Sequence, residues 1–309
     1  MKRTVLLILV GMLCISLAAC SGGEGATDQA QSDQPKVGVS LLNKAHVFYN
    51  KIEAGLVDKA AELEYSLIIQ DASGDANKQM NQVQDFITQK VDAIILCPTN
   101  SAGSKSMVEL AAAAGIPVFT MDIMSDGDTV CHVATDNYKG GSLAAEYMVN
   151  NMMTDKRGDV AVITYSEIES CIEREKGFTD WVAANAPDVN VVAIQNYSGD
   201  QAKAADIMQN MLLMYENLED VFCVGDPAAA GAMASITTAR RQVKVMGFDG
   251  NPEAVEAILD GGLWVASIAQ NPTEIGFTTL QAIKDHLDGK DVPKVIPIAP
   301  YVLDASNAK

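Results

Sequence analysis

The stretch AIILCPTNSAGSKSMVELAAAAGIPVFTM, residues 93–121, decides the fold class of this chain. It begins with the apolar run Ala93–Leu96, continues with helical spacing over Ser104–Ala114, and returns to an apolar run at Pro117–Met121. Apolar runs without polar alternation predict strands that are buried on both faces, and a helix between two such strands predicts a parallel pair. The stretch therefore predicts a strand–helix–strand unit of an α/β protein.

The same rhythm continues on both sides of this unit. We expect further strands at 37–42, 67–69, 160–164, 189–194, 221–224 and 243–248, and further helices at 52–63, 79–89, 172–184, 202–215 and 228–238. Two such series, joined near residues 134–139, predict an α/β fold of two lobes, each a doubly wound parallel sheet. Ligands of such sheets bind at the carboxyl ends of the strands, so the residues directly after each strand are the candidates for a site.

Charge and composition exclude several classes of function. The chain has 22 Lys and Arg against 40 Asp and Glu, a formal net charge of -18. Phosphate backbones repel such a surface, so nucleic acid is not expected as a partner. The chain contains no GxSxG, GxxxxGK[ST] or HExxH motif, and we expect neither an enzyme nor a cofactor.

Histidines and cysteines do not predict a metal site. There are three histidines and no CxxC pair, so a Cys/His zinc site is not expected. Of the six cysteines, four lie in the expected lobes: Cys97, Cys131, Cys171 and Cys223. We expect these four to be free thiols, because Cys97 and Cys223 lie in apolar strands, where a cysteine usually behaves as a small buried hydrophobe.

The N-terminus predicts a lipoprotein signal. Lys2 and Arg3 precede the apolar run Val5–Ala18, and the run ends in Leu-Ala-Ala-Cys at residues 17–20. In this order residues 1–20 resemble a bacterial lipoprotein signal with its lipobox, which implies lipidation of Cys20 and cleavage of the chain just before it. The alternative is an ordinary signal peptide with a chance cysteine. Residues 21–35 are small and polar, so we expect a flexible tether and a location at the cell membrane, facing outside the cytoplasm, at the cell surface or in the periplasm.

Five segments at expected strand ends carry a family resemblance. They are Pro98-Thr99-Asn100, Ala114–Val118 leading to Asp122, Ala134–Asn137 with Gly140-Gly141, Gly247–Gly250, and Ile268–Pro272 with Ile275-Gly276. In their order and spacing they resemble the type I periplasmic binding proteins, in particular the ribose-binding-protein-like sugar receptors of ABC importers. The resemblance runs from about residue 36 to about residue 303.

The resemblance implies two lobes that clamp a ligand between them. It implies a first lobe of residues 36–135 plus 271–299 and a second lobe of residues 136–270 plus 300–309, with hinge strands near Asp136, Gln270 and Ala299. It also implies a monomeric substrate-binding lipoprotein that takes a small sugar-like solute and delivers it to a membrane permease. The alternative is a sensor subunit that presents its ligand to a membrane signalling receptor, for a sugar or a quorum signal.

On the first lobe, the resemblance implies four ligand-binding residues. His46, Phe48 and Tyr49 open the first helix, where ribose-type receptors carry a polar residue and two aromatics that wall the sugar ring. Asp122 follows a strand and would accept hydrogen bonds from hydroxyl groups. The competing interpretations are that Phe48 belongs to the core and that Asp122 only caps a helix.

On the second lobe, the resemblance implies that Arg174, Asp249 and Gln270 contact the ligand. Paired carboxylates such as Asp122 and Asp249 could act on a glycoside, but a neighbouring Arg174 would keep both ionised, which suits binding better than acid catalysis. We expect these groups to face an open cleft, so that their replacement costs affinity and little stability. Asp226, which precedes a proline and a helix, is expected to be an N-cap.

Some positions depart from the ribose-type pattern. Ile123 stands where an arginine is typical, Gly225 where an asparagine is expected, and Gly199 at the place of a third aromatic, for which Tyr197 is a possible substitute. His46 also replaces an asparagine. Polar partners and side-chain volume are lost, so ribose is doubtful as the ligand, and a larger or less polar solute is favoured.

Overall fold

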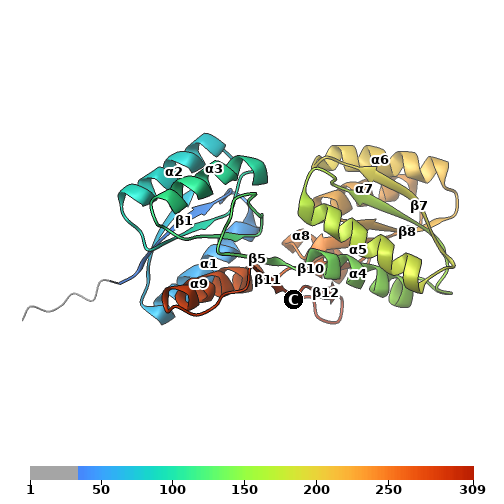
Figure 1. The fold of residues 1–309 in the computed structure, drawn as a ribbon. Coiled ribbons are helices and arrows are strands. Elements are labelled where there is room, and N and C mark those ends of the chain that lie inside the picture. The colour runs from blue at the N-terminus through green and yellow to red at the C-terminus, as the bar shows by residue number, and fades with distance from the viewer. Residues whose placement is uncertain (1–33) are drawn as a thin grey trace, which may run out of the picture. The chain divides into compact units, whose positions relative to one another are not determined.

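The computed structural model describes residues 34–309. The expected signal peptide, Cys20 and nearly all of the expected tether lie outside the described residues. The described part contains two six-stranded sheets, each covered by helices (Figure 1). This confirms the expected α/β fold of two doubly wound lobes.

The first sheet has the strand order β11-β5-β4-β3-β1-β2, and all its neighbouring strands run parallel. Its strands are β1 (Lys36–Leu41), β2 (Ser66–Asp71), β3 (Ala93–Leu96), β4 (Val118–Met121), β5 (Cys131–Thr135) and β11 (Val295–Ile298). Helices α2 (Ala76–Thr88) and α3 (Ser101–Ala113) cover one face, and α1 (Val47–Leu63) and α9 (Pro272–Leu287) pack together on the other (Figure 1).

The second sheet has the strand order β12-β10-β9-β8-β6-β7. Its strands are β6 (Gly158–Thr164), β7 (Val189–Asn196), β8 (Leu218–Cys223), β9 (Lys244–Asp249), β10 (Trp264–Ala269) and β12 (Tyr301–Asp304). Helices α4 (Asn137–Tyr147) and α5 (Glu169–Asn185) pack together on one face, and α6 (Gln201–Met214) and α7 (Asp226–Ala239) on the other (Figure 1). The π-helical turn Met148–Met152 extends α4, and α8 (Pro252–Leu259) precedes β10.

One edge strand departs from the all-parallel expectation. β12 pairs antiparallel with β10, and its first residue, Tyr301, lies opposite Ala269, the last residue of β10. The chain passes from β11 to β12 through two residues, so β12 enters the second sheet at the carboxyl end of β10 and runs back along it. The chain also changes sheets between β5 and α4 and between β10 and α9.

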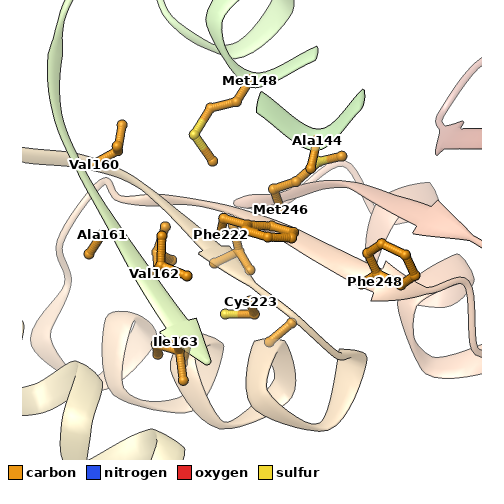
Figure 2. Close-up of a cluster of buried hydrophobic side chains, with 14 of the residues drawn as sticks. Ala144, Met148, Val160, Ala161, Val162, Ile163, Phe222, Cys223, Met246 and Phe248 are labelled. Atoms are coloured by element: carbon orange, nitrogen blue, oxygen red, sulfur yellow. The ribbon is translucent and has the colours of Figure 1, made fainter. Parts of the chain in front are cut away.

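A dense apolar core holds α4 and α5 against the second sheet. Figure 2 shows Ala144 and Met148 facing the side chains of the central strands, among them Phe222 and Phe248. Phe222 stacks on Phe178 of α5 with 4.8 Å between ring centroids. The four cysteines expected to be free are all free and buried. Within residues 34–309 no helix is both long and apolar enough to cross a membrane.

Two glycines fix how closely α4 and α5 approach. A Cβ atom at Gly141 would overlap the carbonyl oxygen of Arg174, and one at Gly177 would overlap the carbonyl oxygen of Tyr138. The backbones of the two helices therefore touch at these positions, which only glycine permits. This contact sets the position of Arg174 on α5.

Asp220 on β8 is a buried acid that lacks a hydrogen-bond partner among residues 34–309. The residue is 1% exposed, and neither of its carboxylate oxygens accepts a hydrogen bond from this part of the chain. Burial raises the pKa of Asp220 to about 7, although the charge of Lys244 on the neighbouring strand lowers it in part. The native state therefore holds a proton here that the unfolded chain loses near pH 4.

We expect Asp220→Asn to stabilise the protein at pH 8 and to change it little at pH 5. Because the native pKa is raised, the stability contributed by the neutral acid is complete below about pH 4 and is lost as the pH rises through about 7. The stability difference between variant and wild type should grow by about 2 kcal/mol from pH 5 to pH 8, measured by urea unfolding. The exposed Asp206→Asn is the control, and an equal effect of both variants would contradict this assignment.

Candidate functional site

Arg174 lies at the carboxyl end of the second sheet, where its Nε and Nη1 are held by hydrogen bonds. Its Nη1 donates to the carbonyl oxygen of Val224 at 2.8 Å and to Oδ1 of Asp249 at 3.1 Å. Its Nε donates to Oδ1 of Asn137 at 2.9 Å, and the guanidinium lies 3.8 Å from the ring centroid of Phe248. A buried cation needs this many partners to offset its desolvation. Its other nitrogen, Nη2, makes no hydrogen bond with residues 34–309.

Among the described residues, only one of the two carboxylate oxygens of Asp249 accepts hydrogen bonds. Its Oδ1 accepts hydrogen bonds from Arg174 and, at 2.7 Å, from Nε2 of Gln270. Oε1 of Gln270 accepts from the Thr135 hydroxyl at 2.6 Å, which links the end of β10 to the end of β5. Within the described part of the chain, Oδ2 of Asp249 accepts no hydrogen bond. Asp249 has a φ of 117°, a strained conformation that is typical of functional sites.

On the first lobe, Asp122 and Tyr49 form a hydrogen-bonded pair of expected site residues. The Tyr49 hydroxyl donates to Oδ2 of Asp122 at 2.9 Å, and the thiol of Cys97 lies 4.0 Å from the same oxygen. Burial raises the pKa of Asp122 to about 6, against the lowering effects of the Tyr49 hydrogen bond and of the charge on Arg174. Asp122 also has a positive φ, 63°.

The aromatic and histidine residues at the start of α1 have different roles. His46 is exposed and is the N-cap of α1, because its Nδ1 accepts from the backbone N–H of Phe48 at 3.2 Å. Phe48 and Tyr49 are each 8% exposed and belong to the apolar core of the first lobe, with ring centroids 5.4 Å apart. The competing interpretation of Phe48 as a core residue therefore agrees with its burial.

The structure thus brings the seven expected site residues into two groups. Arg174, Asp249 and Gln270 form a hydrogen-bonded chain on the second lobe, and Tyr49 and Asp122 form a pair on the first. His46 and Phe48 lie beside that pair, with the imidazole and phenol ring centroids of His46 and Tyr49 6.0 Å apart. The expectation that Arg174 faces an open cleft is wrong. Its side chain is only 7% exposed and forms hydrogen bonds within the second lobe.

Three polar residues of this region were not among the expected site residues. Asn137 and Thr135 hold Arg174 and Gln270, and both stood in the quoted segment 134–137. Tyr197 was considered only as a substitute for an aromatic at position 199; it is 5% exposed and packs edge-on against Tyr165. These three residues lie at or near the strand ends that the sequence predicts. No local pattern, however, indicates which polar side chain forms a hydrogen bond with which partner.

Asp226 does not cap a helix, which corrects the expectation. Gly225 is the N-cap of α7, and Asp226 is its first residue, fully buried. Its carboxylate accepts from the backbone N–H of Asn251 at 2.7 Å and from the Ser267 hydroxyl at 2.8 Å. Burial and the nearby charge of Asp249 raise the pKa of Asp226 well above its usual range. The residue therefore ties α7 to β10 and to the turn after β9.

The chain matches known proteins along most of its length. Residues 37–291 match the family model described as a periplasmic binding protein domain. The ribose import binding protein of Bacillus subtilis is 33% identical, over 98% of this chain and 99% of the relative. The fructose import binding protein of Bifidobacterium longum is 30% identical, over 100% of this chain and 96% of the relative.

Solved structures agree with these relatives. An ABC transporter solute-binding protein of Mycobacterium smegmatis, solved with glycerol, is 30% identical with a TM-score of 0.77, over 89% of this chain and 96% of that chain. The Caulobacter myo-inositol binding protein, solved with myo-inositol, is 28% identical with a TM-score of 0.75, over 88% of this chain and 94% of that chain.

We expect Arg174→Ala to destabilise the fold as well as the site. The variant leaves Asn137, the Val224 carbonyl and the Asp249 carboxylate without their partner. Breaking a buried ion pair from one side typically costs about 3 kcal/mol or more, and urea unfolding without added ligand measures it. Arg157→Ala, which removes an exposed arginine of the same lobe, is the control. Equal stability of the two variants would show that the buried contacts of Arg174 do not hold the lobe together.

Proposed function

Because this chain belongs to the periplasmic binding protein family, we propose that it is the substrate-binding protein of an ABC importer and captures a small, neutral, sugar-like solute. The observation that supports this proposal is that only one carboxylate oxygen of Asp249 accepts hydrogen bonds from residues 34–309. Arg174 and Gln270 hold its Oδ1, while its Oδ2 and the Nη2 of Arg174 make no hydrogen bond within residues 34–309. A fixed acceptor beside a fixed donor matches adjacent hydroxyl groups on a sugar ring.

The two groups of site residues would act on opposite sides of the ligand. On the second lobe, Asp249 accepts from one hydroxyl and Arg174 donates to its neighbour. On the first lobe, Asp122 accepts from another hydroxyl, with Tyr49 keeping its carboxylate in place. The charge of Arg174 acts on Asp122 and favours its ionised form, as an acceptor requires. These carboxylates bind and orient the solute, and no step of bond cleavage is proposed.

Capture would proceed by closure of the two lobes around the solute. We assign the first lobe to residues 36–135 plus 271–299 and the second to residues 136–270 plus 300–309, since the sheets change at these places. The hydrogen bond between Thr135 and Gln270 lies where two of the three connections cross, and Gln270 also holds Asp249. A ligand that contacts Asp249 would thus act on the hinge through Gln270. The closed monomer would then dock on the permease.

The screen that tests this function compares sugars and polyols with nucleosides and amino acids by thermal shift. A ligand at 100-fold its Kd stabilises the native state by about 2.7 kcal/mol, and calorimetry then gives the affinity. We expect a sugar or polyol to bind and Asp249→Ala to weaken it tenfold to a hundredfold, because a desolvated hydroxyl loses a charged partner at about 1.5–3 kcal/mol.

The matched control for Asp249→Ala is Glu256→Gln, an exposed acidic residue on α8 of the same lobe. It should leave the affinity unchanged. Binding of an amino acid or nucleoside instead of any sugar or polyol would overturn the proposed substrate class. Unaltered sugar binding by Asp249→Ala would show that the site lies elsewhere.

We further propose that the protein is anchored to the membrane through lipid on Cys20, facing outside the cytoplasm. The support is the order of basic, apolar and small residues that ends in Leu-Ala-Ala-Cys at 17–20. Cys20→Ala should abolish incorporation of radiolabelled fatty acid and leave the protein uncleaved or released from the membrane. Cys14→Ala, within the apolar run, is the control. Equal labelling of the Cys20 variant and the wild type would contradict the anchor.

A further inference from the structure

Two surface loops of this chain, one on each lobe, have nearly the same sequence. Residues 73–78, after β2, read Ser-Gly-Asp-Ala-Asn-Lys, and residues 198–203, after β7, read Ser-Gly-Asp-Gln-Ala-Lys. Every residue of both loops is exposed. β2 and β7 hold the same place in the strand orders of the two sheets, so the loops correspond in the fold. We call them the first and the second SGD loop.

The two SGD loops also share their backbone conformation. Their serines have φ values of 54° and 52°, and their glycines have φ values of 75° and 77°. In each loop the aspartate is the N-cap of the following helix, and its Oδ1 accepts from the backbone N–H groups two and three residues further on. The left-handed turn explains the glycine and the cap explains the aspartate. Neither explains the lysine.

The lysine of each loop is held by the serine of the same loop. In the first SGD loop, Nζ of Lys78 donates to Oγ of Ser73 at 2.9 Å, and this hydroxyl donates to Oδ2 of Asp71 at 2.9 Å. In the second, the lysine Nζ donates to Oγ of Ser198 at 2.8 Å, and this hydroxyl donates to Oε1 of Glu167 at 3.0 Å. The acid comes from the end of β2 in one loop and from the segment between β6 and α5 in the other. The same arrangement is therefore reached with different sequences.

Both lysines present an ammonium group in a fixed direction. None of the ion pairs formed among residues 34–309 includes Lys78 or Lys203. Each ammonium group is bound to a neutral hydroxyl and has further hydrogens to donate. An acidic side chain of a partner protein would complement it.

The fold does not require the two lobes to be alike at their loops. After β3, Asn100 caps α3 through its side chain, whereas after β8 the N-cap of α7 is Gly225, which makes no side-chain cap. The loops after β1 and β6 differ as well, because their N-caps are His46 and Ile168. Exposed side chains contribute little to stability. The likeness of the SGD loops therefore indicates a contact that both lobes make.

The SGD loops lie far from the connections between the lobes. β2 and β7 are edge strands, and the opposite edges of the two sheets are formed by β11 with β5 and by β12 with β10, where the chain passes between sheets. When lobes close about such connections, the far edges move most. The distance between the two loops would thus differ between the empty and the loaded protein.

We infer that the two SGD loops are equivalent contact points for a membrane partner of two identical subunits, each of which places an acidic side chain on the lysine of one loop. Equal surfaces on the two lobes match a partner that repeats its own surface about a two-fold axis. A partner that holds both loops at once binds most tightly at the spacing of one state of the lobes. The inference rests on the proposed function, because this partner is the permease of the importer.

Alanine variants of the two lysines test the inference by uptake. Cells of the source bacterium carry Lys78→Ala, Lys203→Ala or both in place of the wild-type gene, and they receive the radiolabelled sugar or polyol that best stabilises the wild-type protein. We expect each single variant to lower uptake by the same factor, about threefold to tenfold, through one lost charge contact. The double variant should lower it by the product of the two factors, because contacts on separate lobes are independent.

The matched control removes one exposed cation from each lobe at another place. It combines Lys290→Ala, before β11, with Arg157→Ala, before β6, and both positions lie at the amino ends of strands. This control should keep wild-type uptake. Lys78→Arg and Lys203→Arg retain the charge and should retain most of the uptake. Calorimetry on the purified variants should give the wild-type sugar affinity, and unfolding curves establish that each variant is folded.

The outcomes separate this inference from the function beneath it. Loss of uptake at only one loop would overturn the two equal contacts, and wild-type uptake by the double variant would overturn both contacts, while sugar binding and import stand. An equal loss in the control would show a general effect of charge and would also overturn the inference. If no sugar or polyol binds the wild-type protein, or if wild-type cells do not import the bound one, the proposed function fails and the inference fails with it.

Discussion

The buried guanidinium of Arg174 is the interaction on which the rest of the candidate site depends. A desolvated cation is tolerated only when carbonyl and carboxylate groups surround it, and here they come from α4, from the segment after β8 and from the end of β9. Satisfying the cation therefore fixes three segments relative to α5. The free oxygen of Asp249 takes its direction from this arrangement, because the other oxygen is bound to Arg174 and Gln270.

Two features of the backbone maintain this geometry: the close approach of α4 and α5, and strained conformations at two aspartates. Gly141 and Gly177 let the backbones of α4 and α5 touch, which sets the position of Arg174 on α5. Asp122 directly follows β4 and Asp249 is the last residue of β9, and both have a positive φ, where non-glycine residues cost free energy. These two carboxylates lie at different sheets, so both lobes have an aspartate of positive φ at the end of a strand. The side chains that would contact a ligand therefore also affect the stability of the folded protein.

Three acids in and beside the core of the second lobe, two buried and one partly buried, distinguish it from a purely apolar core. Asp226 is held by a backbone amide and a hydroxyl, Asp249 by a cation and an amide, and Asp220 by neither. The three carboxylates of this lobe therefore differ in what stabilises them. Their different environments explain why the same residue type has different consequences for binding and for the pH dependence of stability.

The sequence by itself determined the α/β class, the two lobes and most element positions, because unbroken apolar strands alternating with helical periodicity allow few other folds. The apolar pattern did not mark β5, β10, β11 and β12, and the family resemblance implied only hinge strands near Asp136, Gln270 and Ala299. The direction of β12 also stayed open, because it depends on the neighbouring strand β10. Family resemblance named Arg174, Asp249 and Gln270, yet only the tertiary structure brought Asn137, Thr135 and Tyr197 to them. The physical reason is that burial and hydrogen-bond partners depend on long-range packing, which no local spacing of residues encodes.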